Sequence, residues 1–458
     1  MSRARRSIGA ACITALCVLA AAPAGAAASN SPQSPAEPPC IVDPASSECV
    51  LVEGAPEGWS PQLQDELASF TGDIRAKIGG HPGFADIGVD FGDRSIQVYF
   101  HGQMPQSIDA VQQAALAADI SIEQVEVASG AARLERNTLR LAEQLTKAQV
   151  SWSTIAPDAA YGALVVSGPG LGEEVALQSR VATAAKLAVV DVPVTTASAP
   201  AVVASDDRTS DLSPFTGGAR LHIDQPGTLN DSVCTAGFSM RSTDGYNYML
   251  TAAHCALYAN GTIIHNGQFF GGAGNLIRQI GTSSWTSALQ DQNQLDATLL
   301  RIPSSSQNAP SMFHGAWDTA TERTVTAWEP MDMGMIGCVS GATSGLKCGV
   351  ARASSATALA SYDGRYHWVF QIYDYVNGSD RAVIAGGDSG GPVYRIKADG
   401  TLSAYGIVGA GQHFAACDPP MNPDTGQSCY RIGFVTPINR IVGVLGGYGA
   451  SSVFLKMG

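Results

Sequence analysis

The residues best suited to chemistry stand in the string GGDSGGP, at residues 386–392. Ser389 could act there as a nucleophile, because flanking glycines permit a tight turn and the close approach of a substrate. The amides of Gly387 and Ser389 would then face the oxygen that gains negative charge during attack, and would form an oxyanion hole. An incidental serine in a glycine-rich turn is the alternative, but so long a string rarely arises by chance.

A nucleophilic serine needs a base, and the string TAAHC at residues 251–255 offers His254. An apolar run beginning at Tyr248 precedes it, so we expect the imidazole at the end of a strand. Cys255 would tie this segment back to the chain, with Cys234 as the expected partner. A lone histidine is more often an ordinary surface or core residue.

The third group is Asp296, in the string LDATLL at residues 295–300. A carboxylate beside an apolar strand is costly unless it is hydrogen-bonded, and the His254 imidazole is its expected partner. A simple turn aspartate is the alternative. The three strings occur in the order His254, Asp296, Ser389, and we therefore predict that these residues form a catalytic triad.

The three strings resemble those of chymotrypsin-family serine proteases. The stretch between Cys338 and Cys348, and the string CTAGF that begins at Cys234, are similar to the streptogrisin and α-lytic protease branch. The resemblance implies a mainly β catalytic domain of two six-stranded antiparallel barrels, trypsin-like in fold, with the site between them. It also implies an α/β pro-region and hydrolysis of peptide bonds through an acyl-enzyme, with no cofactor or metal.

One position departs from that branch. A basic residue near the first of these cysteines commonly pairs with the aspartate before the nucleophile, whereas this chain has Val339. Asp388 therefore needs another counter-ion or a cage of hydrogen bonds. The candidate cations are a new N-terminus freed near Phe215 and the side chain of Arg381.

The resemblance also implies a specificity pocket. Val383 takes the position at its base, where an aspartate would favour Lys or Arg, and Ile432 would narrow it. Gly409 and Gly411 would lie in an extended segment that pairs with the substrate backbone. We expect cleavage after small or medium apolar residues. An ordinary glycine-rich strand is the alternative for that segment.

The elements that must position these groups differ between the two halves of the chain. Residues 61–194 predict an α/β region, with strands at 95–100 and 163–166 and helices at 132–147 and 174–187. From residue 215 to 458, short apolar runs broken by Gly, Asn and Ser favour a β-barrel or sandwich. The Thr-, Ser-, Ala- and Asp-rich stretch 195–214 is predicted to be an exposed linker that holds the processing site.

The N-terminal residues indicate export. Residues 1–28 combine an arginine-rich start, an apolar run and a small-residue end, which is the pattern of a signal peptide. Residues 29–60 form a tail rich in Pro and Ser. The net charge of −13 gives no support to nucleic-acid binding. We expect a secreted monomer without a membrane anchor, whose partners are protein or peptide substrates and its own pro-region.

The cysteines fit that compartment. Two of the ten leave with the leader, and an exported chain is expected to bridge the rest. Nearest-neighbour pairing is our prediction among about a hundred connectivities. The predicted pairs are Cys40 with Cys49, Cys234 with Cys255, Cys338 with Cys348, and Cys417 with Cys429.

Two other classes of function remain open at this point. A protease-like fold could serve as a binding module, although the complete triad argues against this. An esterase could use the same three groups. The run that follows the serine turn, Val393 to Ile396, is predicted to be a strand, whereas the nucleophile elbow of α/β-hydrolases leads into a helix.

Overall fold

The protein was examined as a computed structural model. It describes residues 40–42, 49–51 and, with gaps, 56–458. The larger gaps are residues 199–210, 224–231, 257–267, 272–277, 287–293, 376–380, 418–427 and 447–451. The leader 1–28 and most of the linker 195–214 therefore lie outside the described residues. No helix among the described residues is long and apolar enough to span a membrane.

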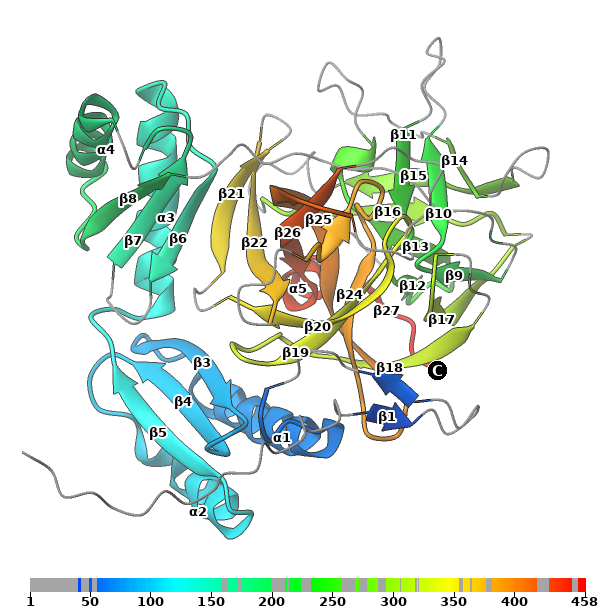
Figure 1. Cartoon of the computed structure of the whole chain (residues 1–458), viewed down its shortest axis with the longest axis horizontal. Helices are drawn as coiled ribbons and strands as arrows, with labels where there is room; N and C mark the ends of the chain where they lie inside the picture. The colour runs from blue at the N-terminus through cyan, green and yellow to red at the C-terminus, as the bar shows by residue number, and fades with distance from the viewer. Residues whose placement is uncertain are drawn as a thin grey trace, which may run out of the picture. The chain divides into compact units, whose positions relative to one another are not determined.

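The N-terminal part, residues 61–198, opens with a capped helix. The Ser60 side chain accepts a hydrogen bond of 3.1 Å from the Leu63 amide, and Pro61 occupies the first turn, where its missing N–H costs nothing. Before it lie paired strands, and after it a three-stranded sheet with a short helix (Figure 1). These elements are β1 (Cys40–Val42), β2 (Cys49–Leu51), α1 (Pro61–Ile78), β3 (Phe84–Asp90), β4 (Ser95–Phe100), η1 (Gln106–Ile108), α2 (Asp109–Ala117) and β5 (Ser121–Glu126).

A second sheet follows in the same part of the chain. Its elements are α3 (Ala131–Lys147), β6 (Thr154–Asp158), β7 (Ala163–Gly168), α4 (Val175–Leu187) and β8 (Val194–Ser198). On α3 the residues Leu134, Leu141 and Leu145 are buried on one face, as their spacing predicts. The predicted strands and helices of this region are confirmed, with bounds that differ by at most a few residues.

The boundary at residue 194 needs correction. Residues 194–198 form β8, which pairs in parallel with β7, so the sheet extends into the predicted linker. The β-branched residues Val194, Thr195 and Thr196 favour this extended backbone. The Thr- and Ser-rich composition predicts a loop here. Residues 194–198 form a strand instead, because they can make backbone hydrogen bonds to β7.

The C-terminal part, residues 214–458, is mainly β, as predicted. Its first sheet has the order β11-β10-β14-β15-β16-β13-β12-β27, and each neighbouring pair in this order is antiparallel (Figure 1). Its strands are β10 (Arg220–Ile223), β11 (Ser232–Thr235), β12 (Ser239–Ser242), β13 (Asn247–Thr251), β14 (Gln268–Gly271), β15 (Arg278–Thr286), β16 (Thr298–Arg301) and β27 (Val453–Leu455).

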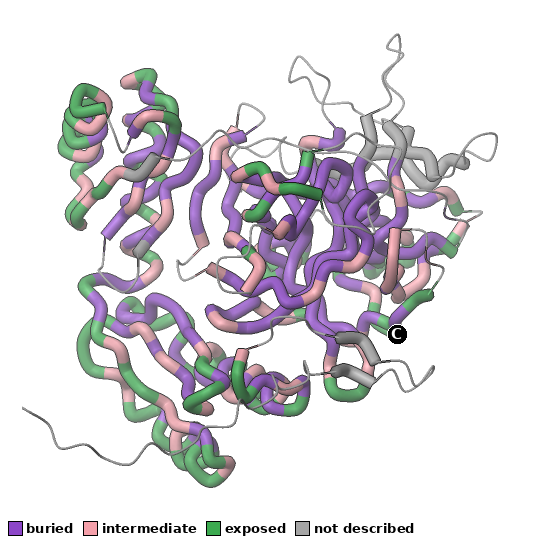
Figure 2. The backbone as a smooth tube through the Cα atoms, in the orientation of Figure 1, coloured by how far each residue is buried: buried purple, intermediate pink, exposed green. Residues whose placement is uncertain are grey.

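The second sheet closes on itself. Following the pairings from β22 through β20, β19, β24, β25 and β26 leads back to β22, which makes a six-stranded barrel. Its strands are largely buried (Figure 2). These strands are β19 (Ile336–Gly341), β20 (Gly345–Arg352), β22 (Arg365–Asp374), β24 (Pro392–Ile396), β25 (Leu402–Ala415) and β26 (Cys429–Pro437).

Shorter elements border these sheets. The strand β21 forms a hairpin with β22 and also pairs with β6 of the N-terminal part, through Leu359 opposite Ile155. One sheet therefore runs from the N-terminal part into the barrel. The remaining elements are β9 (Phe215–Gly217), η2 (His254–Ala256), β17 (Asn308–Phe313), β18 (Glu322–Trp328), β21 (Ala358–Tyr362), β23 (Ile384–Ala385) and α5 (Ile438–Leu445).

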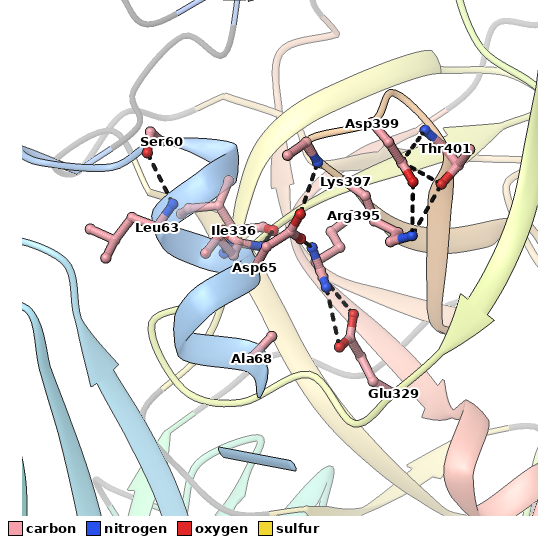
Figure 3. A network of polar contacts seen from close by, with 12 residues as sticks. Ser60, Leu63, Asp65, Ala68, Glu329, Ile336, Arg395, Lys397, Asp399 and Thr401 are labelled. Carbon is pink, nitrogen blue, oxygen red and sulfur yellow. Dashed lines mark hydrogen bonds and ion pairs between the residues drawn. The ribbon is translucent and has the colours of Figure 1, made fainter. Parts of the chain in front are cut away.

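Helix α1 also contacts the C-terminal part through charge. The Asp65 carboxylate pairs with the guanidinium of Arg395, and that guanidinium also pairs with Glu329 (Figure 3). The Asp65 carboxylate also accepts a hydrogen bond of 3.0 Å from the Ala398 amide. The Arg395 side chain is only 7% exposed, so this cation is mostly removed from water. The negative charges of Asp65 and Glu329 therefore depend on the positive charge of Arg395.

We predict that Arg395→Met lowers the free energy of unfolding of the full-length chain by about 3 kcal/mol, because two partly buried carboxylates lose their shared cation. Lys397→Met is the matched control. Lys397 pairs with Asp399, whose side chain is 57% exposed, so its loss should cost about 0.5 kcal/mol. Denaturant unfolding of both variants provides the measurement, and equal losses would contradict the prediction.

Candidate active site

The pairing of β13 with β16 brings His254 and Asp296 together. Thr251, at the end of β13, lies opposite Thr298, at the start of β16. His254 follows Thr251 and Asp296 precedes Thr298, so these two residues lie close together just past the paired strands. The backbone N–H of His254 donates to Asp296 Oδ1 at 2.9 Å, and Nδ1 of its imidazole lies 2.7 Å from Oδ2. Two hydrogen bonds thus fix the imidazole relative to the carboxylate.

The Asp296 side chain is fully buried. Burial opposes its ionisation, but the charge of a protonated His254 and the hydrogen bonds from that residue outweigh burial, so the pKa of Asp296 lies below its usual range. The nearby His367 acts in the same direction. An ionised carboxylate in this position stabilises positive charge on the imidazole.

The Ser389 turn lies against the same segment. The Ser389 carbonyl accepts a hydrogen bond of 2.7 Å from the Thr235 amide, and it lies 3.9 Å from Sγ of Cys255, the neighbour of His254. A disulfide joins Cys234 to Cys255, which connects both contacts. The structure therefore joins His254 to Asp296 by hydrogen bonds and places the backbone of Ser389 against Cys255, the neighbour of His254.

The serine hydroxyl and two amides are available there. The Ser389 hydroxyl is buried and has no hydrogen-bond partner within the described part of the chain. The same part of the chain provides no acceptor for the N–H groups of Gly387 and Ser389. Gly387 has φ +104°, a conformation that favours glycine and shapes this turn. Such amides can stabilise an oxyanion.

The Asp388 carboxylate stabilises the serine turn through hydrogen bonds from backbone amides. Its Oδ1 accepts from the amides of Thr343 and Ser344 at 2.9 and 3.1 Å, and its Oδ2 accepts from the Ala385 amide at 2.7 Å. Burial raises the pKa of Asp388, and these hydrogen bonds act in the opposite direction. Of the two alternatives for Asp388, the hydrogen-bond cage is the one found in this chain.

In the uncut chain the Arg381 side chain does not contact Asp388, since its guanidinium lies 3.7 Å from Asp374. Phe215 is still within the chain, and its amide donates to the Gln307 carbonyl at 2.7 Å, so an N-terminus freed by processing stays a prediction. The backbone of the loop after β19 provides the compensation instead. Sequence patterns could not identify this cage, because main-chain amides have no signature of their own.

The residues predicted for a specificity pocket fall into two groups. Val383 is buried, and its amide donates to the Tyr430 carbonyl at 2.8 Å. A side chain added at Gly411 would meet the Tyr430 ring. Ile432 is half-buried, two residues further along β26. Val383 and Gly411 thus converge on Tyr430, a residue that the sequence had not indicated.

Gly409 belongs to the other group. A Cβ added there would lie 3.1 Å from Asp296 Oδ2 and would overlap the Tyr362 hydroxyl. That hydroxyl donates to Asp296 Oδ2 at 2.9 Å. Sequence reasoning missed Tyr362, because it lies outside every motif string and reaches the site only through the β21–β22 hairpin.

Three of the predicted disulfides are confirmed. They join Cys234 to Cys255, Cys338 to Cys348, and Cys417 to Cys429. The side chains of Cys40 and Cys49 lie outside the described residues. Within the described part, Cys234, His254 and Cys255 form the one metal-like grouping, but both sulfurs are in the disulfide and are not thiolate ligands.

Comparison with known proteins finds no matching family model and no matching curated protein. Among solved structures, the chain is similar to a protease from Nocardiopsis, at 17% identity and a TM-score of 0.36, with 53% of this chain and 99% of that one covered. Protease A of Thermobifida fusca has 19% identity, a TM-score of 0.34 and the same coverages. A chymotrypsin of Cellulomonas bogoriensis has 16% identity, a TM-score of 0.35 and the same coverages.

The solved structures to which this chain is similar, at these identities and TM-scores, are thus two proteases and a chymotrypsin.

We predict that Gly341→Ala lowers the free energy of unfolding by about 2 kcal/mol, because the added methyl would overlap the caged carboxylate of Asp388. Gly443→Ala, in α5, is the control: an added Cβ there meets nothing within 4 Å. This second change should be neutral or stabilising. Thermal unfolding of the two variants tests the prediction, which fails if Gly341→Ala is as stable as the wild type.

Proposed function

We propose that this chain is a secreted serine endopeptidase, made as a precursor, in which Ser389, His254 and Asp296 hydrolyse peptide bonds through an acyl-enzyme. The observation that supports the proposal is that His254 is bonded to the buried Asp296 while the Ser389 turn contacts the adjacent Cys255, and that within the described residues the Ser389 hydroxyl and the Gly387 and Ser389 amides have no partner. Each is a component that acyl transfer needs.

The proposed steps follow from these groups. Ser389 Oγ attacks the carbonyl carbon of the scissile peptide while Nε2 of His254 takes the hydroxyl proton. The amides of Gly387 and Ser389 stabilise the oxygen that becomes negative. The imidazolium, held by Asp296, then protonates the leaving amine, and a water activated in the same way releases the acyl group.

Substrate binding would use β25. This strand pairs with β24 from Leu402 to Ile407 and with β26 from Gly406 to Ala415. No described strand pairs with the other edge of the Gly409–Gly411 segment, so a substrate could add there as a strand. Val383 presents no charge for Lys or Arg, which supports cleavage after small or medium apolar residues.

The N-terminal part would act as a pro-region. Its β6 extends the sheet of the barrel through β21, and its helix α1 contacts Arg395. The leader-like residues 1–28 and the three disulfides support secretion. The proposed processing site lies within residues 199–213, between β8 and the C-terminal part.

We expect Ser389→Ala to lower casein hydrolysis by at least about 10³-fold, because no nucleophile remains. It should also abolish labelling by a fluorophosphonate and leave the full-length chain uncut. Ser311→Ala, which removes a β17 hydroxyl bonded to Glu322, should leave all three unchanged. Rapid labelling of the Ser389→Ala variant would place the nucleophile elsewhere, and hydrolysis of a simple ester without casein cleavage would favour an esterase.

Val383→Asp should shift the preference toward substrates with Lys or Arg before the cleaved bond. A carboxylate at the base of the pocket would pair with their charge, and we expect the ratio of kcat/KM for basic over apolar residues to rise about tenfold. Val383→Asn, which has a similar shape and no charge, is the control. A panel of peptides that differ at this one residue gives the measurement; an unchanged ratio would remove Val383 from the pocket.

A further inference from the structure

The contacts around Asp296 include one group that the proposed mechanism does not use. We propose that Tyr362 is a positioning residue, whose hydroxyl holds the Asp296 carboxylate in the orientation that His254 needs. The inference rests on the proposed function, and it assigns to that site a residue from outside the triad. The phenol oxygen donates to Asp296 Oδ2 at 2.9 Å, and both side chains are buried.

The hydrogen bonds to the Asp296 carboxylate show which of its two oxygens the tyrosine restrains. Within the described part of the chain, Oδ1 accepts one bond, from the His254 amide, whereas Oδ2 accepts two, from the imidazole and from Tyr362. The oxygen that faces the imidazole is therefore the one that the tyrosine restrains. A carboxylate can rotate about its Cβ–Cγ bond, and the third hydrogen bond opposes that rotation.

The position of Tyr362 is itself well defined. It ends β21 and lies opposite Arg365 across the hairpin, and its ring packs against His367 with centroids 4.5 Å apart. The His254 ring lies nearly perpendicular to the same aromatic ring, at a centroid distance of 6.1 Å. The titratable groups facing Asp296 are therefore the two histidines and this phenol.

Gly409 provides the space that the hydroxyl occupies. A Cβ at this position would overlap the phenol oxygen, but it would lie 3.4 Å from the ring carbon that carries that oxygen, an ordinary contact. The same Cβ would be 3.1 Å from Asp296 Oδ2. A serine at position 409 and the hydroxyl of Tyr362 thus compete for one place, from which either could donate to the carboxylate.

This competition gives the experiment. In the full-length chain after its own processing, Tyr362→Phe should lower kcat on a peptide substrate by about tenfold and leave KM within about twofold. Gly409→Ser alone should also lower kcat, because its side chain displaces the phenol. Combining Tyr362→Phe with Gly409→Ser should recover most of kcat, since the new hydroxyl then fits and donates.

The control is Tyr362→Phe combined with Gly409→Ala, which fills the same space without a hydroxyl and should not recover activity. The acid limb of the kcat/KM profile gives a second readout. Without the phenol, Oδ2 holds a protonated His254 more strongly, so that limb should move to higher pH. When a serine hydroxyl at position 409 replaces the phenol as the donor to Oδ2, the acid limb should return to lower pH.

Several results would overturn the proposal: full activity in Tyr362→Phe, equal recovery with serine and alanine at position 409, or an unmoved acid limb. If Tyr362→Phe does not fold, Gly409→Ser alone, which keeps the tyrosine, still decides the matter: an unchanged kcat in that variant would overturn the proposal. The Ser389→Ala variant separates the two hypotheses. Activity that disappears in Ser389→Ala and persists in Tyr362→Phe rejects only the role of the tyrosine, whereas activity that persists in Ser389→Ala rejects the proposed function.

Discussion

The carboxylate of Asp296 is fully buried, and it is tolerable there only because every oxygen is hydrogen-bonded. That requirement constrains the surrounding fold. Strand β13 must end where His254 can donate twice, and the β21–β22 hairpin must deliver a tyrosine hydroxyl from far along the sequence. The first sheet and the barrel are therefore connected at the carboxylate, which accepts donors from both.

The serine turn satisfies a similar constraint with different chemistry. Asp388 is also buried, yet it is compensated by backbone amides of Thr343, Ser344 and Ala385. The first two amides lie in the turn between β19 and β20, and the third lies in β23. One buried acid is thus compensated mainly by side chains and the other mainly by the main chain, and their environments move their pKa values in opposite directions.

The sequence predicted much of this arrangement where the information was local. The triad stood in short strings around His254, Asp296 and Ser389, and alternation of apolar residues located β4 to the residue. The strands that close the barrel come from distant segments, so their order could not be derived from periodicity. Tyr362 was missed for the same reason: its role depends on the β21–β22 hairpin, which brings it to the distant Asp296, and nothing in its neighbours marks it.

The pairing of β6 with β21 has a consequence under the proposal that the N-terminal part is a removable pro-region. Removal of that part would leave β21 without its neighbour β6, as an edge strand with unpaired N–H and C=O groups. The segment Ala358–Tyr362 carries no charge or proline that would discourage another chain from adding there. Release of the C-terminal part would therefore expose an edge strand that ends at Tyr362. Another copy of the chain or an extended peptide could pair with this edge.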